Sequence, residues 1–198
     1  MLFPASGSTL VVVPEGAEKD PVKLADFIEK YNVTMVHFVP SMFTVFLKYI
    51  KAHKYSFEKL KYIILSGERL DASNARMAKD LMPRVDLYNL YGPTECTIDV
   101  SYCLCDDSKS VIPVGRPVWN TEISVVNGAG KRLPVNVTGE LVVYGDLVHI
   151  GEDGNLYYDG RMDSQKKIHG MRISVSDLET YLNEVFDEGK HIIICENK

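Results

Sequence analysis

The sequence lacks the features that mark membrane-spanning and secreted proteins. None of its apolar runs is long enough to cross a bilayer. The first four residues, Met1 to Pro4, show neither the charged start nor the apolar core of a signal peptide. Cysteine is scarce, with four residues in 198, and no cluster of His and Cys completes a zinc site. We therefore expect a cytoplasmic protein with free thiols and no membrane partner.

The sequence also has no excess of basic residues. The net charge of -5 gives no electrostatic footprint for nucleic acid, so no nucleic-acid partner is expected. There is no internal repeat and no low-complexity segment. The glycines around Gly128 and Gly130 lack the spacing of a phosphate-binding loop, and no helical pattern follows them. A hairpin turn at Asn127-Gly128 explains them better. With 45% hydrophobic residues, the chain has enough apolar material for a globular core.

Short apolar runs and amphipathic segments alternate in the first hundred residues. The runs that predict strands are Thr9–Val13, Val33–Val39, Lys61–Leu65 and Val85–Leu90. Three helices are predicted between them. Their expected starts are Asp20 with Pro21 in the first turn, then Ser41, then Asp71 or Ser73. This alternation predicts an α/β fold whose mostly parallel sheet is flanked by helices.

The ends of these predicted strands carry polar and aromatic side chains. His37, Ser66 and Tyr91 lie at or near the carboxyl ends of three strands. Ligands of open α/β sheets bind in the crevice beyond those ends. The topology alone therefore predicts a binding site where these residues meet.

The pattern changes after Asp106, where short strands replace the alternation. Thr121–Val125 and Val137–Val143 are predicted strands of a partial β-barrel, and Trp119 is expected to fill its core. A turn at 153–155 precedes the start of a small α+β subdomain. That subdomain is expected to contain a helix opening at Ser176 and a last strand, His191–Cys195. The predicted domains are residues 1–106, 107–159 and 160–198.

One string combines a strand end with the chemistry of a nucleotide site: Asn89, any residue, Tyr91, Gly92, Pro93, Thr94 and Glu95. Gly92-Pro93 ends the strand and forces a tight loop. The hydroxyl of Thr94 and the carboxylate of Glu95 suit Mg²⁺, which prefers oxygen ligands and phosphate partners. Tyr91 offers a flat face to a base. Taken without its exact sequence, the string is explained equally well as an ordinary surface turn.

The exact string resembles the nucleotide-binding motif of the adenylate-forming, AMP-binding superfamily. It is most similar to the adenylation domains of nonribosomal peptide synthetases. Later segments resemble further motifs of those domains in the same order, and the resemblance covers nearly the whole chain. These segments are Gly115–Thr121, Gly139–Leu141 and Tyr158–Ile173.

The resemblance implies ATP and Mg²⁺ as cofactors and assigns roles to single residues. Thr94 and Glu95 would be catalytic, with Thr94 on phosphate and Glu95 holding the metal. Asn89 would contact adenine and Tyr91 would stack on it. The remaining nucleotide-binding residues would be Gly67, Glu68, Gly92, Asp146 and Arg161. Asp163 would be the hinge about which the small subdomain turns. His169 stands where most members have Arg.

The offsets of the family motifs also place an amino-acid pocket, and its residues resemble those of serine-activating domains. The pocket residues are His37, Ile64, Ser66, Leu90, Ile98 and Asp99. Three of them would narrow the pocket, and three offer donors and acceptors for one hydroxyl. Without the family offsets, these would be ordinary strand-end residues, with His37 simply hydrogen-bonded in the core.

Three classes of function follow from the resemblance. The first is an amino-acid adenylation domain, with L-serine as substrate and a carrier-protein domain with its phosphopantetheine arm as partner. The others are a non-catalytic fragment with residual nucleotide binding, and an acyl- or aryl-CoA ligase. The residues after Glu95, Cys96 to Asp99, resemble peptide synthetases more than CoA ligases.

Several family elements have no counterpart in the sequence. The phosphate loop and the Asp for the substrate ammonium would precede Met1, and a catalytic Lys would follow Lys198. Gly139–Leu141 also lies unusually close to Gly145–Leu147. We therefore expect the chain alone to be inactive, because catalysis of this kind relies on several positioned charges.

Overall fold

The computed structural model describes residues 7–93, 99–119, 121–142, 144–161, 165–168 and 171–174. Its first sheet has five strands in the order β1-β2-β3-β4-β5. The parallel strands are β1 (Met35–Phe38), β2 (Tyr62–Leu65) and β3 (Asp86–Tyr91). Two antiparallel strands follow, β4 (Ser101–Leu104) and β5 (Arg116–Pro117). The predicted α/β fold is confirmed, and its sheet is mixed, with β1, β2 and β3 parallel and β4 and β5 antiparallel.

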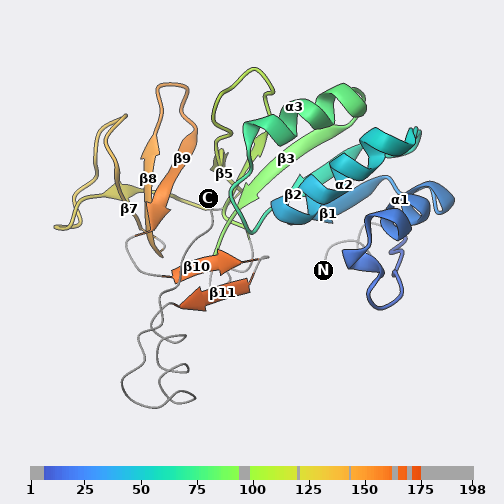
Figure 1. The fold of residues 1–198 in the computed structure, drawn as a ribbon. Coiled ribbons are helices and arrows are strands. Elements are labelled where there is room, and N and C mark those ends of the chain that lie inside the picture. The colour runs from blue at the N-terminus through green and yellow to red at the C-terminus, as the bar shows by residue number, and fades with distance from the viewer. Residues whose placement is uncertain are drawn as a thin grey trace, which may run out of the picture.

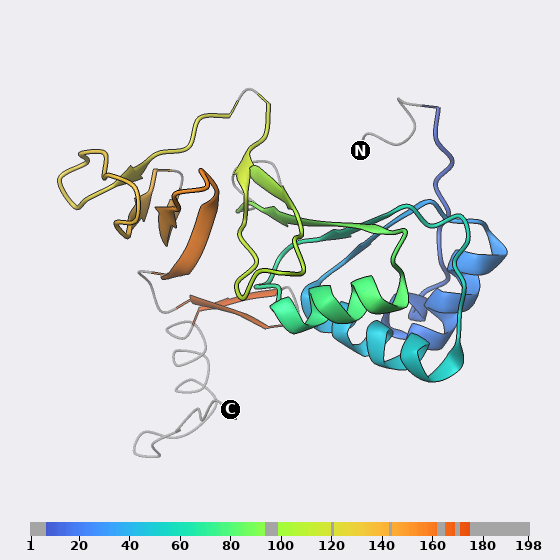
Figure 2. The same cartoon turned by 90° about the horizontal axis from the view of Figure 1, so that it is seen from above.

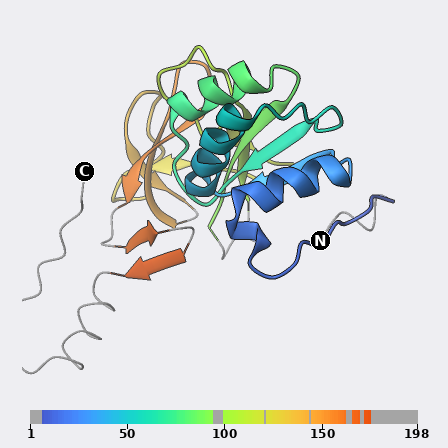
Figure 3. The ribbon, with the colours of Figure 1, turned by 45° about the vertical axis from the view of Figure 1, so that its right-hand side comes forward.

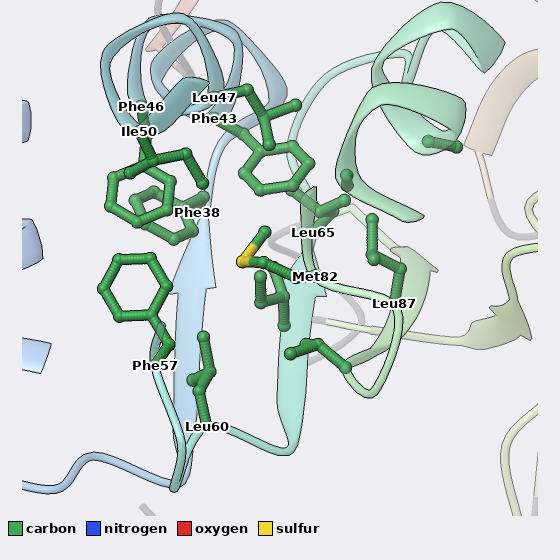
Figure 4. Close-up of a cluster of buried hydrophobic side chains, with 14 of the residues drawn as sticks. Phe38, Phe43, Phe46, Leu47, Ile50, Phe57, Leu60, Leu65, Met82 and Leu87 are labelled. Carbon is green, nitrogen blue, oxygen red and sulfur yellow. The ribbon is translucent and has the colours of Figure 1, made fainter. Parts of the chain in front are cut away.

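Three helices cover one face of this sheet (Figure 2). They are α1 (Pro21–Lys30), α2 (Pro40–His53) and α3 (Ala72–Leu81), and a short 3-10 turn, η2 (Ala17–Lys19), precedes α1. Between helices and sheet, Phe43, Phe46 and Leu47 of α2 meet Phe38 of β1 and Leu65 of β2 (Figure 4). Burial of these large apolar side chains fixes the helices on the sheet.

Proline residues determine where the helices begin as much as capping side chains do. Asp20 caps α1 as predicted, because its carboxylate accepts hydrogen bonds from the amides of Val22 and Lys23. The prediction that Ser41 caps α2 is wrong. The helix begins at Pro40, whose ring fixes a helical φ and which has no N–H to satisfy, so Val39 takes the cap position.

The opposite face of the first sheet carries apolar side chains that remain exposed. Met35, Tyr62, Tyr102 and Leu104 are 37–52% exposed. They lie on one face because strand residues alternate in direction, with Met35 beside Tyr62 in the register. Parallel sheets are normally covered on both faces. In the part of the chain that the structure describes, helices cover only one.

The predicted strand Thr9–Val13 is wrong. The segment forms no strand, and Leu10 and Val12 are 52% and 77% exposed. Figure 3 shows it running outside the sheet toward the N-terminus. A β-branched run becomes a strand only where another strand offers backbone partners, and this run does not lie against the sheet. Val13 alone in it packs against the main core.

A second, antiparallel sheet has the order β6-β7-β8-β9. Its strands are β6 (Val125–Val126), β7 (Gly139–Leu141), β8 (Tyr144–Ile150) and β9 (Leu156–Arg161). The hairpin turn at Asn127 and the turn at 153–155 are confirmed. Over the described residues, the four strands form an open sheet and not a closed barrel. Trp119 does not fill a core, since it is 93% exposed.

A two-stranded antiparallel ladder, β10 (Gln165–Ile168) and β11 (Met171–Ser174), is the last described element. Figure 1 shows it apart from both larger sheets. The helix predicted at Ser176 and the strand His191–Cys195 lie outside the described residues.

Candidate functional site

The carboxyl ends of β1 and β2 bring a histidine and a serine into contact. His37 and Ile64 are register partners, and Ser66 follows directly after β2. The Nε2 atom of His37 lies 2.8 Å from the hydroxyl of Ser66, which is 8% exposed. This contact joins two of the predicted pocket residues at the strand ends, and the strand register places Ile64 beside His37.

The imidazole of His37 is held toward its neutral form. Burial of the ring by its neighbours lowers the pKa of His37, and the negative charge of Asp99 opposes part of that change. His37 as a whole residue stays exposed, so this desolvation is incomplete. A neutral ring that donates to or accepts from a hydroxyl is a suitable pocket wall for a small polar side chain.

Two further pocket residues extend the same surface. Leu90 of β3 faces the same side of the sheet as His37 and Ile64, because Tyr88, two residues earlier, is the register partner of Ile64. Asp99 lies close enough to His37 for its charge to act on the ring. Ile98 lies outside the described residues. This surface is the carboxyl-end part of the open sheet face described above.

Tyr91 lies at the junction of the two sheets. The centre of its ring is 6.0 Å from that of Tyr158 in β9, with the planes tilted by 41°. Tyr91 also packs against the smaller apolar core of the second sheet, whose buried members are Val114, Val125, Leu141, Val148 and Leu156. A base that stacks on Tyr91 would therefore lie between the sheets.

Asn89 is buried beside this junction, with 3% of its surface exposed. Its side-chain amide donates a hydrogen bond of 2.9 Å to the carbonyl of Pro113. That acceptor fixes the orientation of the amide, since only Nδ2 can donate to a carbonyl. The other atom, Oδ1, has no hydrogen-bond donor among the described residues. Buried acceptors are rarely left in this state, so Oδ1 is a candidate contact for a donor on a ligand.

Gly67 and Glu68 have local structural roles. Gly67 has a φ of +91°, a conformation that glycine adopts most easily, in the turn after β2. The carboxylate of Glu68 accepts a 2.9 Å hydrogen bond from the amide of Ser41 at the start of α2. An acidic group at a helix N-terminus is favourable there. The turn after β2 is thereby tied to α2, next to the pocket.

The other predicted nucleotide and hinge residues are placed only in part. Asp146 and Arg161 are register partners in β8 and β9, so the strand pairing brings their backbones together. Gly92 follows β3 directly. Thr94, Glu95 and Asp163 lie outside the described residues.

A charged cluster at the junction was not predicted. Lys109, in the loop after β4, contacts Asp153 in the turn between β8 and β9, and the hydroxyl of Tyr157 lies 3.1 Å from the same ammonium. Lys109 and Asp153 are 44 residues apart. No local pattern marks such a pair, so only the fold could reveal it.

Two other features lie away from the strand ends. The thiols of Cys103 and Cys105 are free, and burial raises the pKa of Cys105 to about 12, so this thiol is a poor nucleophile at neutral pH. A cleft beside α3, at the start of β3, is lined by Ala75, Lys79, Val85, Asp86, Leu87, Leu104, Cys105 and Asp107. None of the described helices is long and apolar enough to cross a membrane.

The chain is similar to known proteins over most of its length. Residues 1–151 match the model of the family described as AMP-binding enzyme. The chain is 31% identical to vanchrobactin synthetase VabF of Vibrio anguillarum over 96% of its length and 8% of that protein. It is 32% identical to zwittermicin A synthase ZmaJ of Bacillus cereus over 89% of its length and 41% of that protein.

A solved structure shares the fold at similar coverage. The Vibrio cholerae adenylation domain AlmE, determined with glycyl-adenosine-5'-phosphate, superposes with a TM-score of 0.78 at 27% identity. The match covers 91% of this chain and 40% of AlmE. The chain thus spans less than half the length of each of these relatives. Since the family model matches about three quarters of its residues, the chain belongs to the family of AMP-binding enzymes.

Proposed function

We propose that this chain is part of an amino-acid adenylation domain that activates L-serine for nonribosomal peptide synthesis. The observation that carries the proposal is the contact between His37 and Ser66 at the strand ends, with Asp99 nearby. The contact supports the proposal because an imidazole and a hydroxyl can each donate to or accept from a substrate hydroxyl. The apolar side chains of Ile64 and Leu90 lie on the same side of the sheet as His37 and would limit the size of the side chain that fits.

The proposed reaction has two steps. A carboxylate oxygen of serine attacks the α-phosphorus of ATP, and the bond to pyrophosphate breaks, giving seryl-AMP. The thiol of a carrier protein's phosphopantetheine arm then attacks the acyl carbon, and AMP leaves. The amino-acid substrate and the carrier-protein partner both fit the relatives, which include phosphinothricin tripeptide synthetase PhsB of Streptomyces viridochromogenes and a solved NRPS protein containing adenylation and PCP domains.

The residues around Tyr91 fit the adenine of the proposed substrate. The unpaired Oδ1 of Asn89 is an acceptor of the kind that the exocyclic amino group of adenine would satisfy. Tyr91, held against the second sheet, offers the stacking surface. Thr94 and Glu95 are proposed as the phosphate and Mg²⁺ contacts, and the metal would neutralise phosphate charge. Gly67, Glu68, Gly92, Asp146 and Arg161 are proposed to complete the nucleotide site, with Asp163 as the hinge.

Serine specificity would come from the polar groups of the pocket, of which Ser66 is buried. A site built to bond a hydroxyl discriminates against an analogue that lacks it by as much as roughly 10⁴–10⁵, because its polar groups are otherwise left unpaired. Alanine should therefore be a poor substrate. Threonine should be limited by its extra methyl group beside Ile64 and Leu90.

The test grafts residues 1–106 into a complete adenylation domain of different specificity and measures amino-acid-dependent pyrophosphate exchange. We expect exchange with serine and little with alanine or threonine, and we expect Ser66→Ala to reduce the preference for serine over alanine. Tyr62→Phe in the same graft is the matched control, since Tyr62 shares the sheet face but lies at the other end of β2. Preference for another amino acid would refute the serine assignment.

A further inference from the structure

Backbone hydrogen bonds join the two sheets between residues 114–115 and Leu156. Val114 donates a hydrogen bond of 2.9 Å to the carbonyl of Leu156, and Leu156 donates one of 2.7 Å to the carbonyl of Gly115. The hydroxyl of Ser101 and the amide of Asn89 hold the carbonyls of Val114 and Pro113 against the first sheet. These bonds connect the two sheets, and Tyr91 packs against the second sheet beside them.

A charged cluster forms a second contact between the two sheets, from the loop after β4 to the turn between β8 and β9. Asp153 contacts the ammonium of Lys109 and accepts hydrogen bonds from the hydroxyl of Tyr157 (2.8 Å) and from both nitrogens of Asn155 (3.0 Å each). Lys109 also lies 5.7 Å from the centre of the Tyr157 ring. Several partners meet at one carboxylate, so this cluster is more than an isolated surface pair.

The cluster is tied to the first layer at both ends, because Arg116 of β5 also belongs to the first sheet. Arg76 of α3 donates a hydrogen bond of 3.3 Å to the carbonyl of Lys109, which ties that loop to the first layer. Arg116 of β5 donates one of 2.9 Å to the carbonyl of Asp153. Tyr157 belongs to β9, one residue before Tyr158, which faces Tyr91. Lys109 is therefore linked to Tyr158 through its contact with the preceding residue of the same strand.

We propose that Lys109, Asp153 and Tyr157 are positioning residues that hold the second sheet against the first and so fix how Tyr158 packs on Tyr91, the ring on which a nucleotide base is proposed to stack. The part of this inference that concerns the nucleotide rests on the function proposed above. None of the three residues needs to touch the nucleotide. Their effect passes through the backbone pairing of residues 114–115 with Leu156.

The experiment compares Lys109→Met and Asp153→Asn with the native chain by two measurements. The first is amide hydrogen exchange at Val114 and Leu156, whose N–H groups form the bonds across the junction. The second is the affinity for AMP by isothermal titration calorimetry. We expect exchange at both amides to accelerate about tenfold, as loss of a partly exposed charged network implies, and the affinity for AMP to fall. Lys109→Arg keeps the charge and should show the native exchange rates at both amides and the native affinity for AMP.

The matched control is the ion pair of Arg132 with Glu122, two residues between β5 and β7. Their side chains are 73% and 77% exposed, respectively. Arg132→Met should leave both measurements unchanged. Unchanged exchange in Lys109→Met, or an equal effect from Arg132→Met, would overturn the inference. Faster exchange with an unchanged affinity for AMP would overturn the positioning role. If the native chain binds no AMP, the proposed nucleotide site fails, and the exchange rates still decide whether the cluster holds the sheets together. Asp153→Asn keeps the side-chain shape and serves if Lys109→Met does not fold.

Discussion

At the scale of single residues, Asn89 links strand β3 to the segment that leads into the second sheet. Its amide is buried and bonded to the carbonyl of Pro113. Asn89→Ala would leave that carbonyl unpaired, so we expect a loss of about 1–3 kcal/mol in the free energy of unfolding. Urea denaturation of both chains measures this. Ser56→Ala, at an exposed position, should change the free energy of unfolding by less than about 0.5 kcal/mol.

His37 should make the stability of the chain depend on pH. Burial lowers its pKa in the folded state below the ordinary value of 6.5, so the unfolded chain takes up the proton first as the pH falls. The stability is complete above pH 6.5 and decreases as the pH falls toward the folded pKa. The decrease should be small, because the residue as a whole is exposed to solvent. His37→Gln should flatten the decline in Tm between about pH 7.5 and 5.5. A decline identical to that of the native chain would contradict this explanation.

At the scale of elements, the residue directly before β5 approaches β4 so closely that only glycine fits there. Gly115 has a φ of +90°, and a Cβ there would lie 1.9 Å from the carbonyl oxygen of Tyr102. We expect Gly115→Ala to destabilise the chain by more than the roughly 1–3 kcal/mol that a strained φ alone costs. Thermal melting measures it. Gly128→Ala is the control, because a Cβ at Gly128 meets open space. Equal melting temperatures for the two variants would rule out this close contact.

Periodicity was sufficient to predict the elements whose apolar faces meet. The helices α1, α2 and α3 and the strands β1, β2 and β3 all follow from alternating runs, because burial against a partner is what those patterns encode. The same pattern fails at Thr9–Val13, where no strand pairs with the run. It also fails to place the start of α2, since Pro40 outweighs the capping preference of Ser41.

The candidate site was predictable where it depends on strand ends and not where it depends on tertiary pairing. His37 and Ser66 meet because parallel strands in register present their ends at one edge. The burial of Asn89 under Pro113 and the contact of Lys109 with Asp153 depend on how the two sheets pack. Neighbouring residues in the sequence carry no information about that packing.

At the scale of the whole molecule, the bare face of the first sheet should cause self-association. Met35, Tyr62, Tyr102 and Leu104 are exposed together on it, and contiguous apolar surface of this kind favours association. We expect the chain to be oligomeric or only marginally stable when expressed alone. Leu104→Lys should shift the population toward monomer in size-exclusion chromatography with light scattering.

The control for this experiment is Val45→Lys, which changes a similarly exposed apolar residue on α2, away from the bare face. It should leave the oligomeric state unchanged. A stable native monomer with one sharp thermal transition would show that the bare face has no such effect.

The most direct test of the proposed function is a ¹⁵N NMR titration of the chain with a seryl-adenylate analogue in which a sulfamoyl group replaces the phosphate. We expect shifts concentrated at His37, Ser66, Leu90, Asp99 and Tyr91, with smaller shifts at the pocket residues when the alanyl analogue is used. Shifts centred on the cleft beside α3, around Lys79 and Cys105, would contradict the proposed function, as would the absence of any response.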